Sequence, residues 1–468
     1  MNDIGLIGLG VMGTNLILNI YDNYSRLISG FDIDNDKINN FKIITNEKNE
    51  ILLFNNLEDF VFSLKKPRKI IILIPAGKYV DILLEKLLPL LEDYDNLLDG
   101  GNEWYKNIEL RQKLPLVIKK QINYLGCGIS GGENGARNGP CMMAGGSKKC
   151  YDSFNLILNK ISAKFNNEVC VDYFGENGIG NYIKMVHNGI EYALMQLISE
   201  VYLILKISYG LTNKEISNVF NNWNLNKLNS YLLEITIKIL NKKDETSNLD
   251  LLDIIKDQVD SKGTGYMTVV DALEKKIPIN IIYSALEFRN ISSFILKVNV
   301  NILVQPLENK AVKKDLKDIL INLENGLYFC FILTFFQGIN LIYQHYYLET
   351  SLKLNLVKLL KVWRNGCIIK CNLLNEFIQF IENDNQEINK IIEFIYKNIN
   401  YYNDLNIIIK SNDLPIITLS NCFQFSNILN SKKLHSAQLL QAMRDCFGGH
   451  MYERTDIDGK IHTNWLQN

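Results

Sequence analysis

The stretch that decides the fold is Asp3-Ile4-Gly5-Leu6-Ile7-Gly8-Leu9-Gly10-Val11-Met12-Gly13. It predicts a short buried strand over 3–7, a glycine turn over 8–13 and a helix that continues to about Tyr21. In Gly8-x-Gly10-x-x-Gly13 the glycines permit a tight turn, close backbone approach to a pyrophosphate, and close packing of helix on strand. Because a helix N-terminus favours phosphate, the stretch predicts a dinucleotide site, with a plain strand-to-helix turn as the alternative.

Asp32 strengthens the prediction of a dinucleotide site. It follows an apolar run over 28–31, about 20 residues beyond the glycine turn, where an acid bonds the ribose hydroxyls of a dinucleotide. An ordinary turn residue at the end of a strand is the alternative, and the surrounding pattern favours the nucleotide role.

The rest of the N-terminal region alternates short apolar runs with helical segments, which predicts a parallel sheet covered on both faces. The runs lie at 69–74, 96–98 and 124–127. After about Gly178 long helical periodicity dominates, and from His435 the sequence becomes polar. We therefore expect an α/β Rossmann-like dinucleotide-binding domain over 1–178, a large all-α domain over 179–434, and a C-terminal tail over 435–468.

Composition narrows the class of protein. The chain has 468 residues, 47% hydrophobic and 22% charged, with a formal net charge of -1, so neither nucleic acid nor a membrane is an expected partner. The strongly apolar run Leu327 to Phe336 is about half the roughly 20 residues of a membrane span. The N-terminus lacks the basic region of a signal peptide, and the cysteines are scattered, so we expect a cytoplasmic protein with reduced thiols.

A second feature points to chemistry. The segment Ile183 to Leu205 is apolar nearly all the way round, as a buried helix is, but Lys184, His187, Asn188 and Glu191 interrupt it. Their offsets of 0, 3, 4 and 7 place all four on one face over two turns. Such a stripe is either a solvated edge or the lining of a cavity, and its position after the dinucleotide domain favours a site between domains. A desolvated lysine can act as a base, and a nearby carboxyl as its acid partner.

Taken together, several motifs resemble the 6-phosphogluconate dehydrogenase family over essentially the whole chain. Besides the glycine turn, they are Asp99-Gly100-Gly101-Asn102, Ile129-Ser130-Gly131-Gly132-Glu133, Lys184-Met185-Val186-His187-Asn188-Gly189-Ile190-Glu191-Tyr192, Lys262-Gly263-Thr264-Gly265, Arg289, Trp363-Arg364-Asn365-Gly366-Cys367, Arg444-Asp445, His450 and His462-Thr463.

The resemblance implies the activity and the acid and base. The family oxidatively decarboxylates 6-phosphogluconate to ribulose 5-phosphate and CO2, without metal and as a homodimer, in the pentose phosphate pathway. Lys184 would take the proton of the C3 hydroxyl during hydride transfer and stabilise the enolate formed on loss of CO2, and Glu191 would protonate C1.

The resemblance also implies the binding residues. The carboxylate and hydroxyls of the sugar acid would be held by Asn102, Ser130, Gly131, Gly132, His187 and Asn188. The phosphate would be held by Tyr192, Lys262, Thr264 and Arg289, with Arg444 and His450 from the tail of the other subunit. The cofactor would contact Gly8, Gly10, Val11, Met12, Gly13, Asp32, Ile33, Asp34, Ile74, Pro75, Ala76 and Asn102.

Two departures fall at the nucleotide site. The family has Asn-Arg-Thr or Asn-Arg-Ser where this chain has Asp32-Ile33-Asp34, and Pro75 replaces a usual lysine. NADP is the cofactor that the resemblance implies, but an acid suits a free ribose hydroxyl better than a 2'-phosphate. We therefore expect NAD to be used at least as well as NADP.

The sequence is also compatible with two rival functions. Another β-hydroxyacid dehydrogenase would share the fold and the lysine while acting on a smaller, unphosphorylated acid, and the phosphate-binding set weighs against it. A catalytically retired nucleotide-binding dimer would account for the altered cofactor loop, and the intact Lys184 and Glu191 weigh against that reading.

Overall fold

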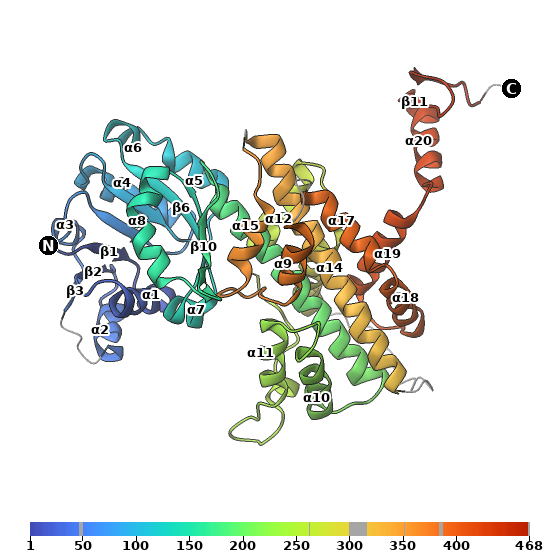
Figure 1. Ribbon diagram of the computed structural model, residues 1–468, viewed down its shortest axis with the longest axis horizontal. Helices are drawn as coiled ribbons and strands as arrows, with labels where there is room; N and C mark the ends of the chain where they lie inside the picture. The colour runs from blue at the N-terminus through green and yellow to red at the C-terminus, as the bar shows by residue number, and fades with distance from the viewer. Residues whose placement is uncertain (46–49, 262, 299–315, 351, 383–386, 467–468) are drawn as a thin grey trace.

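The computed structural model describes residues 1–45, 50–261, 263–298, 316–350, 352–382 and 387–466. A sheet-containing domain at the N-terminal end adjoins a helical domain, and the last part of the chain projects away from both (Figure 1). One long helix, α9 (Ile179–Leu203), leads from the first domain into the second.

The first domain is built on an eight-stranded sheet in the order β10-β7-β6-β5-β4-β1-β2-β3. The strands from β3 to β6 are parallel, as expected, whereas β7 runs antiparallel to β6. The sheet is therefore mixed rather than fully parallel. Its strands are β1 (Ile4–Ile7), β2 (Ile28–Phe31), β3 (Ile51–Phe54), β4 (Lys69–Ile72), β5 (Asn96–Asp99), β6 (Asn123–Ser130), β7 (Cys141–Gly146) and β10 (Val171–Tyr173).

Helices cover both faces of this sheet, which explains why its central strands are apolar throughout. Apolar side chains of α1, α2 and α8 pack with one face in one buried cluster, and those of α3 to α6 pack in another. The helices are α1 (Val11–Asn23), α2 (Asn35–Ile44), α3 (Leu57–Phe62), α4 (Lys78–Leu90), α5 (Tyr105–Gln112), α6 (Pro115–Lys119), α7 (Gly132–Asn138) and α8 (Lys148–Ile161). A small β8 (Lys164–Phe165) and β9 (Glu168–Val169) ribbon follows.

The second domain is helical, as predicted. Helix α9 begins four residues before the predicted Ile183, and a π-helical turn over Ile204–Ser208 follows it. The remaining helices are α10 (Asn213–Asn224), α11 (Tyr231–Leu240), α12 (Thr264–Glu274), α13 (Asn280–Val298), α14 (Leu316–Glu349), α15 (Leu356–Trp363), α16 (Leu373–Ile381), α17 (Glu387–Lys397), α18 (Tyr401–Ser411) and α19 (Ile417–Asn430).

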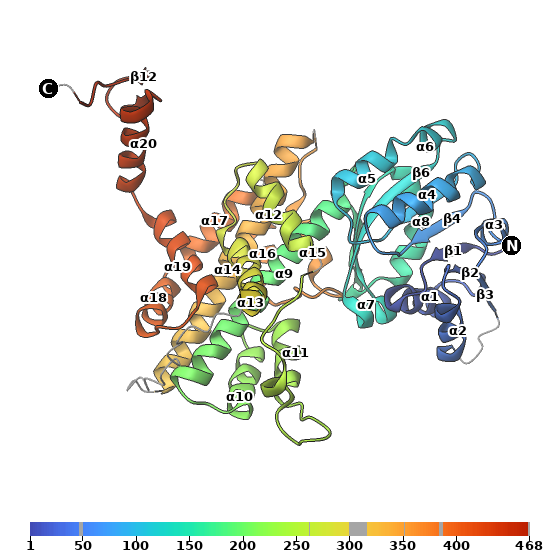
Figure 2. The ribbon, with the colours of Figure 1, turned by 180° about the vertical axis from the view of Figure 1, so that it is seen from behind.

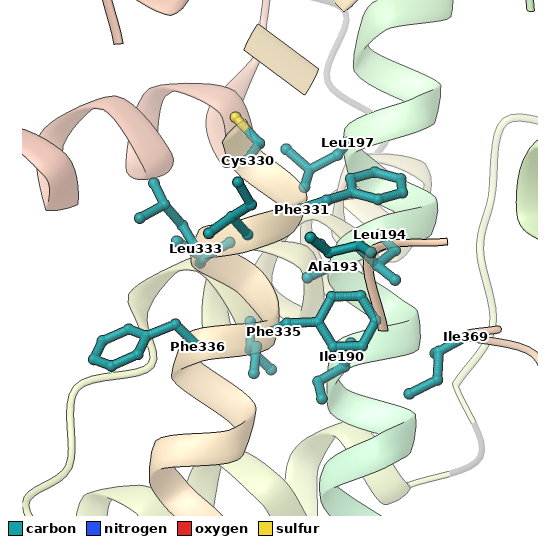
Figure 3. Close-up of a cluster of buried hydrophobic side chains, with 14 of the residues drawn as sticks. Ile190, Ala193, Leu194, Leu197, Cys330, Phe331, Leu333, Phe335, Phe336 and Ile369 are labelled. Carbon is teal, nitrogen blue, oxygen red and sulfur yellow. The ribbon is translucent and has the colours of Figure 1, made fainter. Parts of the chain in front are cut away.

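The core of the second domain forms where α9 crosses α14. Side chains of Ala193 and Leu194 on α9 meet Phe331 and Phe335 on α14 (Figure 3). Gly338 lets the helices approach, because a Cβ there would lie 2.5 Å from the Ile190 side chain. Helix α14 is long and apolar enough to cross a membrane, but 72% of its most apolar window is buried inside the protein, as in the core helix of a soluble domain.

The tail consists of α20 (His435–Gly448) and a two-stranded ribbon of β11 (Tyr452–Glu453) and β12 (Lys460–Ile461). Viewed from behind, it stands clear of the helical domain (Figure 2). Large apolar side chains are exposed along it, among them Leu439, Leu440 and Phe447. A surface of this kind is typical of a segment that packs against another chain.

Candidate active site

The polar stripe of α9 is buried rather than solvated. Lys184 is 6% exposed, His187 is fully buried, Asn188 is 7% exposed, and the Glu191 side chain retains 21% exposure. The opposite face of the helix packs against α14. The stripe therefore has the burial expected of groups that line a site, and the alternative of a wet helix edge is excluded.

Lys184 lies where α9 packs closely against strand β6 of the sheet. A Cβ at Gly128 of β6 would lie 2.2 Å from Cβ of Lys184, so only glycine permits this approach. Desolvation lowers the pKa of Lys184, although the negative charge of Glu191 opposes the shift. Burial therefore favours the neutral amine, which is the form that a proton acceptor needs.

A hydrogen-bonded row links the stripe to neighbouring elements. Nε2 of His187 lies 3.3 Å from Oγ of Ser130, and Nδ1 lies 3.2 Å from Oδ1 of Asn188. Asn188 in turn donates to Oγ1 of Thr264 at 3.2 Å. Burial, followed by the nearby Lys184, lowers the pKa of His187 well below its ordinary value, so the imidazole is neutral and orients its neighbours by hydrogen bonding.

A cationic corner forms one turn further along α9. The Arg289 guanidinium stacks on Tyr192, with its carbon 3.6 Å from the ring centre, and donates to the Asp260 carbonyl at 3.0 Å. Gly265 makes room, because a Cβ there would lie 2.6 Å from the tyrosine ring. Thr264 begins α12 after Gly263, which has a left-handed backbone. The predicted Lys262 lies outside the described residues.

The remaining predicted substrate residues follow strands of the sheet. Asn102 comes after β5, and Ser130 ends β6 and leads into Gly131 and Gly132. Since β5 and β6 are adjacent and parallel, these residues share the carboxyl edge of the sheet. Asn102 and Gly132 are exposed, as contacts for a ligand should be.

Asn181 is a neighbour that sequence reasoning missed. Its side-chain amide donates to the carbonyl of Gly101 at 3.2 Å, so it ties the turn before Asn102 to α9. A signal was available in the sequence, because Asn181 precedes Lys184 by three residues and continues the same polar stripe.

The glycine turn fits a dinucleotide. Cβ atoms at Gly8 and Gly13 would lie 2.3 Å from the Leu73 carbonyl and 1.8 Å from the Gly8 carbonyl, so both positions require glycine for packing. Gly10 caps α1 and has open space where a Cβ would point. Val11 is exposed beside it, and Met12 is half-buried. This is the close backbone approach at a helix N-terminus that a pyrophosphate needs.

Asp32 is buried and hydrogen-bonded, which the sequence did not indicate. It is 6% exposed, its carboxylate accepts from the amides of Leu9 and Asp34 at 2.8 and 3.0 Å, and Lys37 lies 3.7 Å away. The side chain thus fixes the glycine turn to the end of β2. An ionised carboxylate has further acceptor sites, so a ribose contact is compatible with these bonds.

Among the positions that depart from the family motif, Asp32 is buried, Asp34 is half-buried, and Ile33 and Pro75 are at the surface. Ile33 is 84% exposed, Asp34 caps α2 through a bond from the Asp36 amide at 2.9 Å, and Pro75 is exposed between the half-buried Ile74 and Ala76. The loop after β4 is itself anchored, because Glu103 accepts from the Gly77 amide at 2.7 Å.

Arg111 completes this anchor, and no sequence motif predicts it. It is 2% exposed and binds Glu103 at 2.6 Å and the Gly77 carbonyl at 3.0 Å. Among the described residues no group of three or more His, Cys, Asp or Glu side chains is placed to hold a metal ion.

Arg444 and His450 are not brought to the site within one chain. Both are exposed on the projecting tail, far along the molecule from the sheet edge (Figures 1 and 2).

Comparison with known proteins agrees with this arrangement. Residues 3–175 match the family model for the NAD binding domain of 6-phosphogluconate dehydrogenase, and residues 180–465 match the model for its C-terminal domain. A solved structure of 6-phosphogluconate dehydrogenase from Plasmodium falciparum, described in its apo form and in complexes with NADP+ and with 6-phosphogluconate, shares 40% identity with a TM-score of 0.88. The match covers 99% of this chain and 100% of that one.

Curated relatives give the same picture. The NADP(+)-dependent, decarboxylating enzyme of Bacillus subtilis is 37% identical, with 99% of each chain covered. A chloroplastic enzyme of Arabidopsis thaliana, 6-phosphogluconate dehydrogenase, decarboxylating 3, is 37% identical, with 100% of this chain and 98% of the relative covered.

Proposed function

This chain belongs to the 6-phosphogluconate dehydrogenase family, and we propose that it oxidatively decarboxylates 6-phosphogluconate to ribulose 5-phosphate and CO2. The observation that carries the proposal is the buried row of Lys184, His187, Asn188 and Glu191 beside the carboxyl edge of a dinucleotide-type sheet. The close relationship along the whole chain weighs against a β-hydroxyacid dehydrogenase that acts on a smaller acid.

Lys184 acts first as the base. The bound dinucleotide supplies the acceptor for the hydride of C3. Neutral Lys184 takes the proton of the C3 hydroxyl, and the 3-keto acid that forms loses CO2 because its ketone accepts the electrons of the breaking bond. The lysine ammonium then stabilises the developing enolate, in a setting where little water screens its charge.

Glu191 acts as the acid that finishes the reaction. It sits two turns from Lys184 on the same face and retains partial exposure, so it can exchange protons with solvent. Protonation of the enediol at C1 gives ribulose 5-phosphate. His187, Asn188 and Ser130 hold the hydroxyls, and Asn102, Gly131 and Gly132 hold the carboxylate end from the sheet edge.

The phosphate is held at the cationic corner. Tyr192, Thr264, Arg289 and Lys262 bind it from one subunit. Arg444 and His450 reach it from the tail of the second subunit of a homodimer. Support comes from the projection of the tail and its exposed apolar side chains. The three segments 1–178, 179–434 and 435–468 thus serve cofactor, substrate and partner subunit.

NADP is the cofactor proposed for this chain, as for the Bacillus and Plasmodium relatives. The contacts are those of the glycine turn, Asp32 to Asp34 and Ile74 to Ala76. Use of NAD at least as well as NADP remains our expectation, since Ile33 supplies no cation for a 2'-phosphate.

We also propose a cytoplasmic location. All nine cysteines are unpaired and eight are at least partly buried, as suits a reducing compartment. The chloroplastic relative shows that members of the family also work elsewhere.

One assay tests the activity. Purified protein is given 6-phosphogluconate with NADP or NAD, and both absorbance of the reduced nicotinamide and release of CO2 are followed. We expect both signals to rise together. Turnover with neither cofactor would instead support the retired, nucleotide-binding dimer.

A further inference from the structure

The tail contains a polar centre of its own, built around Asp445. Although the tail stands clear of the helical domain, Asp445 is fully buried, and the other described residues of α20 are not. Its carboxylate accepts from Nδ1 of His462 at 3.0 Å, the Thr463 amide at 3.1 Å, Nε1 of Trp465 at 2.7 Å and the Met451 amide at 2.8 Å. One side chain thus joins the end of α20 to both sides of the terminal ribbon.

These bonds fix the chain on either side of the two proposed phosphate ligands. Arg444 immediately precedes Asp445, and His450 immediately precedes Met451. Met451 has a φ of 58°, a left-handed backbone that is uncommon for residues other than glycine, so its turn needs support of the kind that Asp445 gives.

A second side chain extends this frame. Gln441 accepts from Nη1 of Arg444 at 2.9 Å and donates to the Met451 carbonyl at 2.5 Å. His450 packs edge-on against Phe447, with ring centres 5.8 Å apart. Both Arg444 and His450 remain exposed while these bonds are made.

The bonding favours an ionised Asp445. Desolvation by itself would raise the pKa of this carboxyl, but the bonds from His462, Trp465 and the two backbone amides outweigh it and lower the pKa below its usual range. The carboxylate therefore stays ionised and keeps its acceptor role at neutral pH.

We propose that Asp445 is a positioning residue that preassembles the tail, so that Arg444 and His450 enter the partner's active site already spaced to grip the substrate phosphate. The proposal rests on the proposed function of those two residues. Because the tail is already ordered before the substrate binds, binding does not have to supply the free energy of ordering it. More of the interaction energy with the phosphate then appears as affinity.

The test compares Asp445→Asn with Asp456→Asn. The matched control removes an exposed tail carboxylate whose described partner is Arg454, at 2.5 Å. KM, kcat and the mass of the assembled dimer are measured for each variant. For Asp445→Asn we expect KM for 6-phosphogluconate to rise on the order of ten-fold, the size of one weakened charge-assisted contact, with kcat and the KM for NADP within about three-fold of wild type.

A second readout separates positioning from general damage to the tail. Gluconate lacks the phosphate, so the ratio of kcat/KM for 6-phosphogluconate to that for gluconate reports the phosphate grip. We expect Asp445→Asn to lower this ratio about ten-fold. An equal loss with both substrates would overturn the proposal.

Mixed dimers test whether Asp445 acts across the interface. In a dimer of one Lys184→Met chain and one Asp445→Asn chain, the intact Lys184 site receives a wild-type tail, and KM should return to the wild-type value. When both substitutions are on one chain and the other is wild type, the active site receives the altered tail, and KM should stay high. Equal KM in the two mixtures would overturn the proposal.

Failure of the role proposed for Asp445 can be distinguished from failure of the proposed function. A wild-type protein without activity on 6-phosphogluconate would defeat the proposed function itself. An active wild type with an Asp445→Asn variant that matches the Asp456→Asn control would defeat only the role of Asp445.

Discussion

The proposed catalytic face of α9 and the nucleotide loops differ in how tightly the structure constrains them. Lys184, His187 and Asn188 are buried, and each contacts a segment distant in the sequence. Lys184 packs against Gly128, His187 lies within hydrogen-bonding distance of Ser130, and Asn188 donates to Thr264. Ile33 and Pro75 are exposed. The residues of the buried α9 face match the motif of the family, whereas the departures lie in the nucleotide loops, at exposed Ile33 and Pro75 and at buried Asp32.

The difference has a physical cause. A substitution on the α9 face would leave an unpaired polar group or fill space that the sheet occupies, at a cost of about 1–3 kcal/mol or more. A substitution at an exposed position changes packing little, so it acts chiefly through a ligand. The chemistry is thus fixed by the core, while the choice of dinucleotide is open to change.

The largest effect is expected at Lys184. Lys184→Met keeps the length of the side chain but removes the base, so kcat should fall by about 10²–10⁴-fold, the usual worth of general base catalysis. Lys149→Met, at an exposed position on α8, is the control and should match wild type. Steady-state kinetics and mass measurement of the dimer check both. Activity of Lys184→Met near that of the control would remove the lysine from the mechanism.

The next effect tests how closely the face is held. In Gly128→Ala the new Cβ would lie 2.2 Å from Cβ of Lys184, so α9 has to move away from β6. A displacement near 1 Å should lower kcat by about 10²-fold. The measurement is kcat together with circular dichroism, which should show a folded protein. A folded variant with unchanged kcat would mean that the approach of helix and sheet is not needed for catalysis.

A smaller effect is expected at the nucleotide loop. Ile33→Arg places a guanidinium where it can pair a 2'-phosphate, a charge-assisted contact of about 1.5–3 kcal/mol. The ratio of kcat/KM for NADP to that for NAD should rise by about ten-fold or more over wild type. Ile43→Arg, on the exposed surface of α2, serves as the control for added charge. Strong NADP preference in the wild type itself would contradict our expectation for NAD.

The smallest effect on activity concerns a buried histidine of α14 that packs on α9 outside its polar stripe. His345 stacks on Tyr182, and burial followed by nearby Lys275 lowers its pKa to about 4. Between pH 6.5 and 4 the unfolded chain therefore binds a proton that the folded chain does not, so stability falls as pH falls.

His345→Phe should remove this contribution. From pH 7 to pH 5 the wild type should lose about 2 kcal/mol more of its free energy of unfolding than His345→Phe does. The kcat of the variant at pH 7 should equal that of the wild type. Urea unfolding at the two pH values measures the difference. Parallel pH dependence in the two proteins would show that His345 titrates normally.

Much of this protein was predictable from local sequence. The glycine turn, the alternation of strands and helices, and the polar stripe each follow from short-range geometry with a period of two or 3.6 residues. The structure confirms the Rossmann-like domain, the helical domain and the burial of Leu327 to Phe336. The family motifs supplied the proposed roles, which spacing alone left open.

Tertiary structure decided what depends on distant partners. Three contacts join segments far apart in the chain: Lys184 against Gly128, Asn181 with the Gly101 carbonyl, and Arg111 with the Gly77 carbonyl. The antiparallel direction of β7 beside β6 does not follow from periodicity either. Periodicity gives the direction of a side chain along its own helix, but not what lies opposite it. Only packing shows that Lys184 is dry, that Asp32 is bonded to the glycine turn, and that Asp445 is the centre of the tail.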